Sequence, residues 1–384
     1  MKKKSISVLL CVVALCCVFA FSGCDITPVP EKGYNYDAIP DTMTSTSGYE
    51  LAVVTDVGQL KDKGFNQGTW EGLKRYAHEN KISYKYYQPA NGEQATDADR
   101  VAAMTAAINN GAKVIVTPGF LQSTALTQVA PENPDVKFVF IDGEIKDMRI
   151  NKDNISGVSF SEQESGYFAG YASVMEGYKN LGFMGGGSGT NPAVNRFGWG
   201  FIQGANAAAL EKKVNVKMKF SFKYGQSFAS SGELQTMANG WYNDGTETIF
   251  CCGGSMFDSI KAAAAVNRDA KVIGVDVDQS NESDRVITSA IKGLREAVVR
   301  CLETIYANNW QAELGGKDII LSAKDDATGL LPGEEFWMLK NFTYAQYQEL
   351  FQKVVKGTIV IDKTLPELTS GALSLDKVVV DYVK

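Results

Sequence analysis

The chain has 384 residues, of which 45% are hydrophobic, 21% charged and 10% aromatic, and this globular composition excludes a fibrous or wholly disordered protein. Its length fits roughly two to three domains. It holds 38 basic and 44 acidic residues without a basic block, which argues against nucleic-acid binding, and with His78 as its one histidine it cannot build a histidine-rich zinc site.

The first 23 residues are predicted to be a lipoprotein signal peptide. Lysines at positions 2–4 precede an apolar run over 8–15, which is the arrangement of a secretory signal. The segment ends in FSGC at 21–24, which resembles the lipobox of bacterial lipoproteins, where the cysteine is diacylated and becomes the first mature residue. We therefore expect Cys24 to anchor the protein by a lipid to the outer side of the cytoplasmic membrane. The alternative is a soluble export signal with an incidental cysteine.

A flexible tether is predicted over 24–48. This stretch contains Pro28, Pro30 and Pro40 with several serines and threonines but almost no aliphatic side chains. Such a composition cannot bury enough apolar surface to fold by itself. The folded part is therefore expected to begin near Tyr49.

From Tyr49 onward the chain alternates short β-rich runs with stretches of helical apolar spacing, such as 67–79 and 97–109. The predicted strands cover 50–55, 83–87, 114–117, 138–141, 155–160, 180–184, 216–222, 248–251, 272–275 and 286–289. This alternation, with nearly continuous apolar strands, favours an α/β fold in which helices cover mainly parallel sheets. The length favours two such lobes.

Ligands of open parallel sheets bind beyond the carboxyl ends of the strands, so the residues that follow the predicted strands are site candidates. These positions carry Asp56, Asp142 and Asp276, together with glycine-rich turns that include Gly253. The phosphate-loop pattern GxxxxGK[ST] and the nucleophile pattern GxSxG are both missing from the sequence. We therefore predict no catalytic residues, no metal and no cofactor.

Several ordered motifs resemble the basic membrane protein family, which comprises substrate-binding lipoproteins of ABC transporters and includes purine nucleoside receptors. The matching segments are DVG at 56–58, DKGFNQ at 62–67, FVFID at 138–142, FSEQE at 160–164, LGFMGG at 181–186, FGWGF at 197–201, GVDVDQ at 274–279 and SAIK at 289–292. One departure is the SMF run at 255–257, where similar chains often have a glycine-rich turn.

The resemblance implies the type I periplasmic-binding-protein fold, in which two lobes close on a ligand. It places residues 49–160 and 286–316 in an N-terminal lobe and residues 161–285 and 317–384 in a C-terminal lobe. It puts hinges near Phe160, near 280–289 and near 317–322, and it implies an open form that ligand closes. The partners that it implies are a nucleoside and an ABC permease, and we expect the protein to act as a monomer.

The matched residues have side chains that suit a nucleoside. Asn66 can pair with a base edge, Asp142 can accept from a base N–H, and Asp276 can accept from both ribose hydroxyls while Lys292 holds that carboxylate. Aromatic rings can stack on the base. The predicted ligand-binding residues are Asp56, Phe65, Asn66, Asp142, Phe197, Trp199, Gly253, Asp276 and Lys292.

Two function classes stay open at this point. The first is a solute receptor that delivers a purine nucleoside to a permease, and the second is a sensory binding protein of the same fold that signals to a membrane partner. An enzyme acting on a nucleoside would need a metal-binding carboxylate cluster after the first strand or a phosphate-binding cluster of cations. The carboxylate cluster is missing, because Asp56 is followed by Val57 and Gly58. The sequence therefore favours a binding protein.

Overall fold

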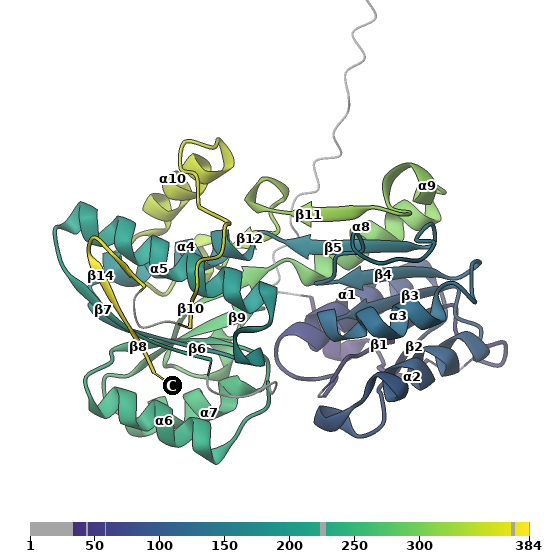
Figure 1. Cartoon of the computed structure of the whole chain (residues 1–384), viewed down its shortest axis with the longest axis horizontal. Coiled ribbons are helices and arrows are strands. Elements are labelled where there is room, and N and C mark those ends of the chain that lie inside the picture. Colours follow the sequence, from purple (N-terminus) through teal and green to yellow (C-terminus); the bar gives the residue numbers. More distant parts are fainter. Residues whose placement is uncertain (1–33, 44, 58, 223–227, 370–372, 384) are drawn as a thin grey trace, which may run out of the picture.

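The computed structural model describes residues 34–43, 45–57, 59–222, 228–369 and 373–383. The predicted signal peptide and Cys24 lie outside the described residues. The chain forms two α/β lobes that lie side by side, each built on its own sheet (Figure 1). The α/β prediction is thus confirmed, and the ten predicted strands correspond to the first ten strands of the structure within a few residues.

The first lobe has a six-stranded, fully parallel sheet with the order β11-β5-β4-β3-β1-β2. Its strands are β1 (Leu51–Val54), β2 (Tyr84–Tyr87), β3 (Val114–Pro118), β4 (Lys137–Ile141), β5 (Ile155–Phe160) and β11 (Asp318–Leu321). Apolar side chains of both sheet faces are buried under helices, so this lobe has three layers. Its helices are α1 (Phe65–Asn80), α2 (Asp97–Asn109), α3 (Ser123–Val129), α8 (Leu294–Tyr306) and α9 (Trp310–Glu313).

The second lobe has an eight-stranded sheet with the order β12-β10-β9-β8-β6-β7-β14-β13, in which β12 and β13 run antiparallel to their neighbours. Its strands are β6 (Asn180–Gly185), β7 (Val216–Ser221), β8 (Thr248–Cys252), β9 (Lys271–Asp276), β10 (Val286–Lys292), β12 (Thr328–Gly329), β13 (Ser374–Leu375) and β14 (Val378–Tyr382). Helices again cover both faces, and they are α4 (Glu162–Glu176), α5 (Pro192–Lys212), α6 (Gly232–Asn243), α7 (Met256–Val266) and α10 (Tyr344–Val355).

Helices α4 and α5 pack in unusually close contact, and glycines make this possible. A Cβ atom at Gly166 would lie 2.1 Å from the carbonyl oxygen of Phe197, and one at Gly204 would lie 1.9 Å from that of Tyr167. The glycines at 200 and 204, which look like part of a motif in the sequence, therefore serve helix packing, whereas Gly198 makes room for the rings of Phe183 and Phe220 in the sheet. This packing fixes the N-terminal end of α5, which faces the other lobe.

The chain passes between the lobes three times, and two of these crossings differ from the sequence-based boundaries. The first lies between β5 and α4, near Phe160 as predicted. The predicted return at 280–289 is wrong, because β10 pairs with β9 in the second sheet and the chain enters the first lobe only between Lys292 and α8. The predicted lobe boundary at 317 is also a few residues too early, because β11 pairs with β5 and the crossing follows it, close to the hinge predicted near 317–322.

The second half of the predicted tether is ordered in the structure. Residues 34–43, which we call the strap, lie on the first lobe, and Ile39 is only 4% exposed within its core. Tyr84 donates a hydrogen bond to the carbonyl of Pro40 at 2.7 Å. The prediction of a flexible tether over 24–48 is therefore wrong for the strap, which gains its order from tertiary contacts.

No helix among the described residues is both long and apolar enough to cross a membrane. The cysteines of the described part, Cys251, Cys252 and Cys301, are free and buried. Adjacent residues of a strand point to opposite faces of the sheet, so the neighbouring pair in β8 cannot easily form a disulfide.

Candidate ligand-binding site

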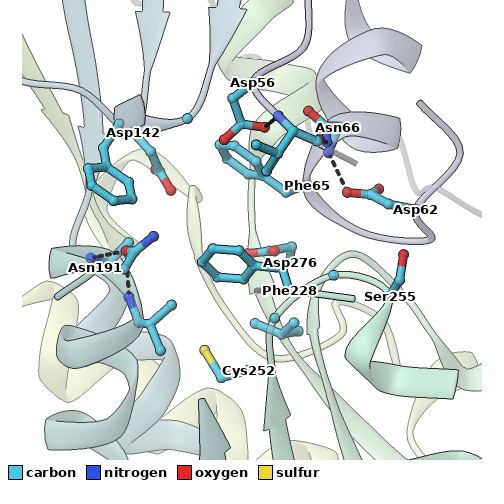
Figure 2. A pocket seen from close by; sticks show the side chains of 18 of the residues that line it. Asp56, Asp62, Phe65, Asn66, Asp142, Asn191, Phe228, Cys252, Ser255 and Asp276 are labelled. Carbon is cyan, nitrogen blue, oxygen red and sulfur yellow. Dashed lines mark hydrogen bonds between the residues drawn. The ribbon is translucent and has the colours of Figure 1, made fainter. Parts of the chain in front are cut away.

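A cavity lined by residues of both lobes lies between them at the carboxyl ends of the strands, which is where open parallel sheets bind their ligands. Figure 2 shows Asp56, Phe65 and Asn66 of the first lobe opposite Asn191 and Cys252 of the second. The predicted site residues that line this cavity are Asp56, Phe65, Asn66, Asp142, Phe197, Gly253, Asp276 and Lys292.

Trp199 is the one predicted site residue that does not line the cavity. It is 7% exposed and belongs to the apolar core beneath the second sheet. Residues two apart on a helix point in different directions, so Phe197 and Trp199 cannot both face the ligand. The prediction of Trp199 as a stacking residue is not supported by its position.

Residues 56–57 and 59–64, together with the start of α1, contribute to the wall on the first lobe. The carboxylate of Asp62 accepts hydrogen bonds from the backbone N–H groups of Gly64 (3.0 Å), Asn66 (3.0 Å) and Gln67 (3.1 Å). It thereby satisfies N–H groups that the first turn of a helix leaves unpaired. This capping fixes the turn that presents Phe65 and Asn66 to the cavity.

Asn66 and Asp56 are themselves held by the backbone. The amide nitrogen of Asn66 donates to the carbonyl of Val57 at 3.1 Å, and the N–H of Val57 donates to the carboxylate of Asp56 at 2.6 Å. Gly119 has a φ of +98°, and a Cβ atom there would lie 2.0 Å from Asp56 Oδ2. Only glycine leaves room for the Asp56 carboxylate at this place.

Asp142 and Asp276 share an uncommon backbone conformation at the ends of their strands. Their φ angles are +56° and +67°, in the left-handed region that aspartate tolerates better than most residues. The backbone therefore turns sharply after β4 and at the end of β9, and both carboxylates line the cavity. Non-glycine residues held in this region are common at ligand sites.

Lys292, at the end of β10, lies at the centre of a buried charge cluster. Its ammonium is 2.5 Å from Asp142 Oδ2, 3.2 Å from Glu162 Oε1 and 3.8 Å from Asp276 Oδ1. Arg196 donates from Nε to Glu162 Oε2 at 2.5 Å. Both cations are therefore already paired with carboxylates.

Opposing effects set the ionisation of this cluster. Burial disfavours the charged form of Glu162, but Lys292 and Arg196 outweigh it and lower the pKa of this carboxyl. Burial also disfavours the charged form of Lys292, but Asp142, Glu162 and Asp276 together raise the pKa of its ammonium. Glu162 and Lys292 are thus both charged in neutral solution.

Burial raises the pKa values of the other cavity carboxyls. It raises the pKa of Asp56 to about 7 and that of Asp62 to about 6. It likewise raises the pKa of Asp276 to about 7, although Lys292 acts in the opposite direction. The pKa of Asp142 is raised as well, chiefly by burial. Burial therefore brings the pKa values of Asp56 and Asp276 close to neutrality, well above the ordinary range of a carboxyl.

The second lobe contributes further lining residues that sequence reasoning missed. Asn191 caps α5 by accepting from the N–H groups of Ala193 (2.9 Å) and Val194 (3.2 Å), and its side-chain nitrogen points into the cavity (Figure 2). An asparagine directly before a proline at a helix start is a recognisable capping signal. The lining residues that were not predicted also include Gln59, Asp62, Glu93, Phe120, Phe228, Cys252 and Ser255.

The lobes touch at the rim of the cavity through Lys63. Its ammonium lies 2.8 Å from Glu282 Oε2 and 3.4 Å from Asp258 Oδ1, both on the second lobe. Its carbonyl accepts a hydrogen bond from Gln279 Nε2 at 2.8 Å. The structure therefore shows a closed arrangement of the lobes.

Comparison with known families gives a match over most of the chain. The family model described as ABC transporter substrate-binding protein PnrA-like matches residues 49–364. The ABC transporter nucleoside-binding protein BmpA of Lactococcus lactis subsp. cremoris is 29% identical over 76% of this chain and 82% of its own length. Basic membrane protein D of Borreliella burgdorferi is 29% identical over 81% of this chain and 87% of its own length.

Solved structures show the same fold. A solute-binding protein of an ABC transporter system from Aeropyrum pernix superposes with a TM-score of 0.69 at 23% identity, covering 84% of this chain and 95% of its own. A second such protein, from Conexibacter woesei, gives a TM-score of 0.64 at 20% identity, covering 82% of this chain and 99% of its own. The two-lobed architecture is thus that of periplasmic solute-binding proteins.

Proposed function

Since the chain belongs to the PnrA-like substrate-binding proteins of ABC transporters, which bind solutes and are not enzymes, we propose that its solute is a purine nucleoside. BmpA of Lactococcus lactis, which is similar over most of the chain, is a nucleoside-binding protein by name. The argument below rests on the side chains of this cavity.

Buried acceptor atoms carry the proposal. Asn66 Oδ1, Asp142 Oδ1 and Asp276 Oδ1 are buried and have no hydrogen-bond partner among the described residues. Leaving such atoms unpaired costs about 1–3 kcal/mol each, so they favour a ligand that brings N–H and O–H donors. A nucleoside brings both kinds, from the edge of its base and from its two ribose hydroxyls.

The charge balance of the cavity favours a nucleoside over a nucleotide. Lys292 is the one cation among the described residues that line the cavity, and carboxylates already surround it. Among the described lining residues, a phosphate would therefore meet several carboxylates and no free cation, which costs binding energy. A neutral nucleoside avoids this repulsion.

Aromatic side chains supply flat apolar surface for the base. Phe65 and Phe120 line the cavity from the first lobe, and Phe197 and Phe228 line it from the second. Stacking of a base on such a ring contributes about 1–3 kcal/mol. A base between the lobes can therefore contact both and stabilise the closed arrangement.

Mass spectrometry of small molecules released from the purified protein, followed by calorimetric titration with inosine, adenosine and inosine 5′-monophosphate, tests the proposal. We expect a purine nucleoside among the released molecules, and we expect both nucleosides to bind more tightly than the monophosphate. Failure of all purine nucleosides to bind, or preference for the monophosphate, would contradict it.

We further propose that Cys24 is lipidated, so that the protein captures its solute at the membrane surface and passes it to the permease. The FSGC segment at 21–24 supports this. Replacement Cys24→Ser should leave nucleoside binding unchanged and move the protein from the detergent phase to the aqueous phase. If the Cys24→Ser protein still partitions into detergent, the anchor is not at this cysteine.

A further inference from the structure

The strap at residues 34–43 makes its strongest polar contacts through one side chain, Asp41. Asp41 Oδ1 accepts from Trp70 Nε1 at 3.0 Å and from the ammonium of Lys74 at 2.9 Å. Asp41 Oδ2 lies 2.7 Å from the ammonium of Lys61. Burial opposes ionisation of this carboxyl, but these three donors outweigh it and lower its pKa. Asp41 is thus a carboxylate that ties three separate donors together.

The three donors belong to the two segments that form the first-lobe wall of the cavity. Trp70 and Lys74 lie on α1, whose first turn carries Phe65 and Asn66. Lys61 directly precedes Asp62, the residue that caps this turn. Asp41 therefore connects the middle of the helix to the loop in front of it without lining the cavity itself.

A second strap residue reaches the helix that follows Lys292. The guanidinium of Arg295 lies 4.9 Å from the centre of the Tyr36 ring. Arg295 also forms an ion pair with Glu71 of α1 at 2.5 Å. The strap thus contacts both α1, whose first turn lines the cavity, and α8, which begins two residues after the lining residue Lys292.

We propose that the strap is a positioning element of the binding site, in which Asp41 holds Lys61 and α1 so that Asp62, Phe65 and Asn66 keep their ligand-binding geometry. This inference rests on the proposed function for the identity of the ligand. Asp41 and Lys61 do not line the cavity. They act through the loop and the helix, not through contact with the solute.

A replacement at Lys61 can show whether the strap positions the binding site or only stabilises the fold. Its side chain is 55% exposed, so its ion pair with Asp41 adds little to the free energy of unfolding. If the pair instead keeps the loop in its binding-competent form, the apparent affinity falls in proportion to the competent fraction that is lost. The replacement Lys61→Met should therefore weaken binding while the unfolding temperature stays nearly unchanged.

The test compares Lys61→Met, Asp41→Asn and the double variant with wild type, using inosine as probe at a temperature well below unfolding. Lys219→Met, which removes a surface ion pair with Asp244 in the second lobe, is the matched control. We expect Kd to rise by up to about fivefold in Lys61→Met and at least as much in Asp41→Asn, with no further loss in the double variant and no change in the control.

Hydrogen exchange without ligand distinguishes this inference from the proposed function. In both single variants the amides of Gly64, Asn66 and Gln67, which Asp62 caps, should exchange faster than in wild type. Unchanged exchange at these amides, or unchanged inosine affinity in both variants, would overturn the role of the strap. If wild type binds no purine nucleoside, the proposed function fails, and the exchange data alone decide on the strap.

Discussion

The ammonium of Lys292 lies 2.5 Å from Oδ2 of Asp142, although Lys292 ends β10 of the second sheet and Asp142 directly follows β4 of the first. Their ion pair joins the lobes at the wall of the cavity, where both side chains are almost fully buried. The same ammonium also faces Glu162 and Asp276. One cation thereby holds together the carboxylates of both lobes.

Replacing this cation should destabilise the protein strongly. Lys292→Met leaves three buried carboxyls with Arg196 as their remaining cation, and removal of one partner from a buried charge group typically costs about 3–5 kcal/mol. Denaturant unfolding at neutral pH measures this loss. The loss should shrink at acidic pH, where the carboxyls take up protons. Equal stability of variant and wild type in neutral solution would show that the cluster is not electrostatically coupled.

Asp276→Ala should cost more affinity for inosine than Phe197→Ala. A charged acceptor contributes about 1.5–3 kcal/mol for each hydrogen bond from a ribose hydroxyl, whereas stacking contributes about 1–3 kcal/mol in total. Calorimetry below the unfolding temperature compares the two. Phe197 is also packed edge-on against Phe250, so its replacement should lower the unfolding temperature as well. A larger loss of affinity in Phe197→Ala would contradict the ribose role of Asp276.

Affinity for inosine should rise with pH through neutrality. Burial raises the pKa of Asp56 and of Asp276 to about 7, so part of each population is protonated there and accepts hydrogen bonds poorly. Binding should therefore strengthen from about pH 6 to about pH 8 and release protons. Asp276→Asn should flatten this dependence. A wild-type affinity that is constant over this range would contradict ionisation-linked binding.

The same pKa shifts predict the opposite trend for the stability of the ligand-free protein. Because the folded-state pKa values of Asp56, Asp62 and Asp276 lie above the ordinary value of 3.8, the folded state binds more protons than the unfolded state. Their contribution to stability is present below the unfolded pKa and is lost as pH rises through about 6 to 7. In the triple variant with asparagine at these positions, the free energy of unfolding in urea should not fall over this pH range. If it falls with pH as steeply as in wild type, these three carboxyls are not the cause.

Lys63 should control how long the ligand stays bound. Its ammonium links the loop of the first lobe to Glu282 and Asp258 of the second, and burial of this pair is incomplete. Lys63→Met should speed dissociation of inosine, measured by stopped-flow fluorescence. Added salt should speed dissociation from wild type and affect the variant much less, because salt screens exposed ion pairs. The same salt response in both proteins would show that the ion pairs of Lys63 do not slow dissociation of the ligand.

The strand-end aspartates could be predicted because buried parallel strands are visible as apolar runs and their carboxyl ends share one edge of the sheet. Asp56, Asp142 and Asp276 all line the cavity for this reason. Trp199 could have been excluded by helical geometry, since it stands two positions after Phe197. Asn191 carries a capping signal that points to a helix start but not to a cavity.

Other features depend on contacts between distant segments and leave no local pattern. The position of β10 in the second sheet is decided by its pairing with β9, which apolar spacing cannot reveal. The strap has the composition of a tether, yet it is ordered, because its Asp41 forms an ion pair with Lys74, whose side chain is only 2% exposed. A buried lysine needs such a partner, but its burial is known only from the fold.

The account depends most directly on Asp276 accepting hydrogen bonds from a ribose. Calorimetry of wild type with inosine and with 2′,3′-dideoxyinosine, side by side at the same pH, tests this. We predict that the dideoxy compound binds at least tenfold more weakly, since loss of one charge-assisted hydrogen bond alone is worth about 1.5–3 kcal/mol. Equal affinity of the two compounds would show that Asp276 does not bind a ribose and would contradict the assignment of a nucleoside.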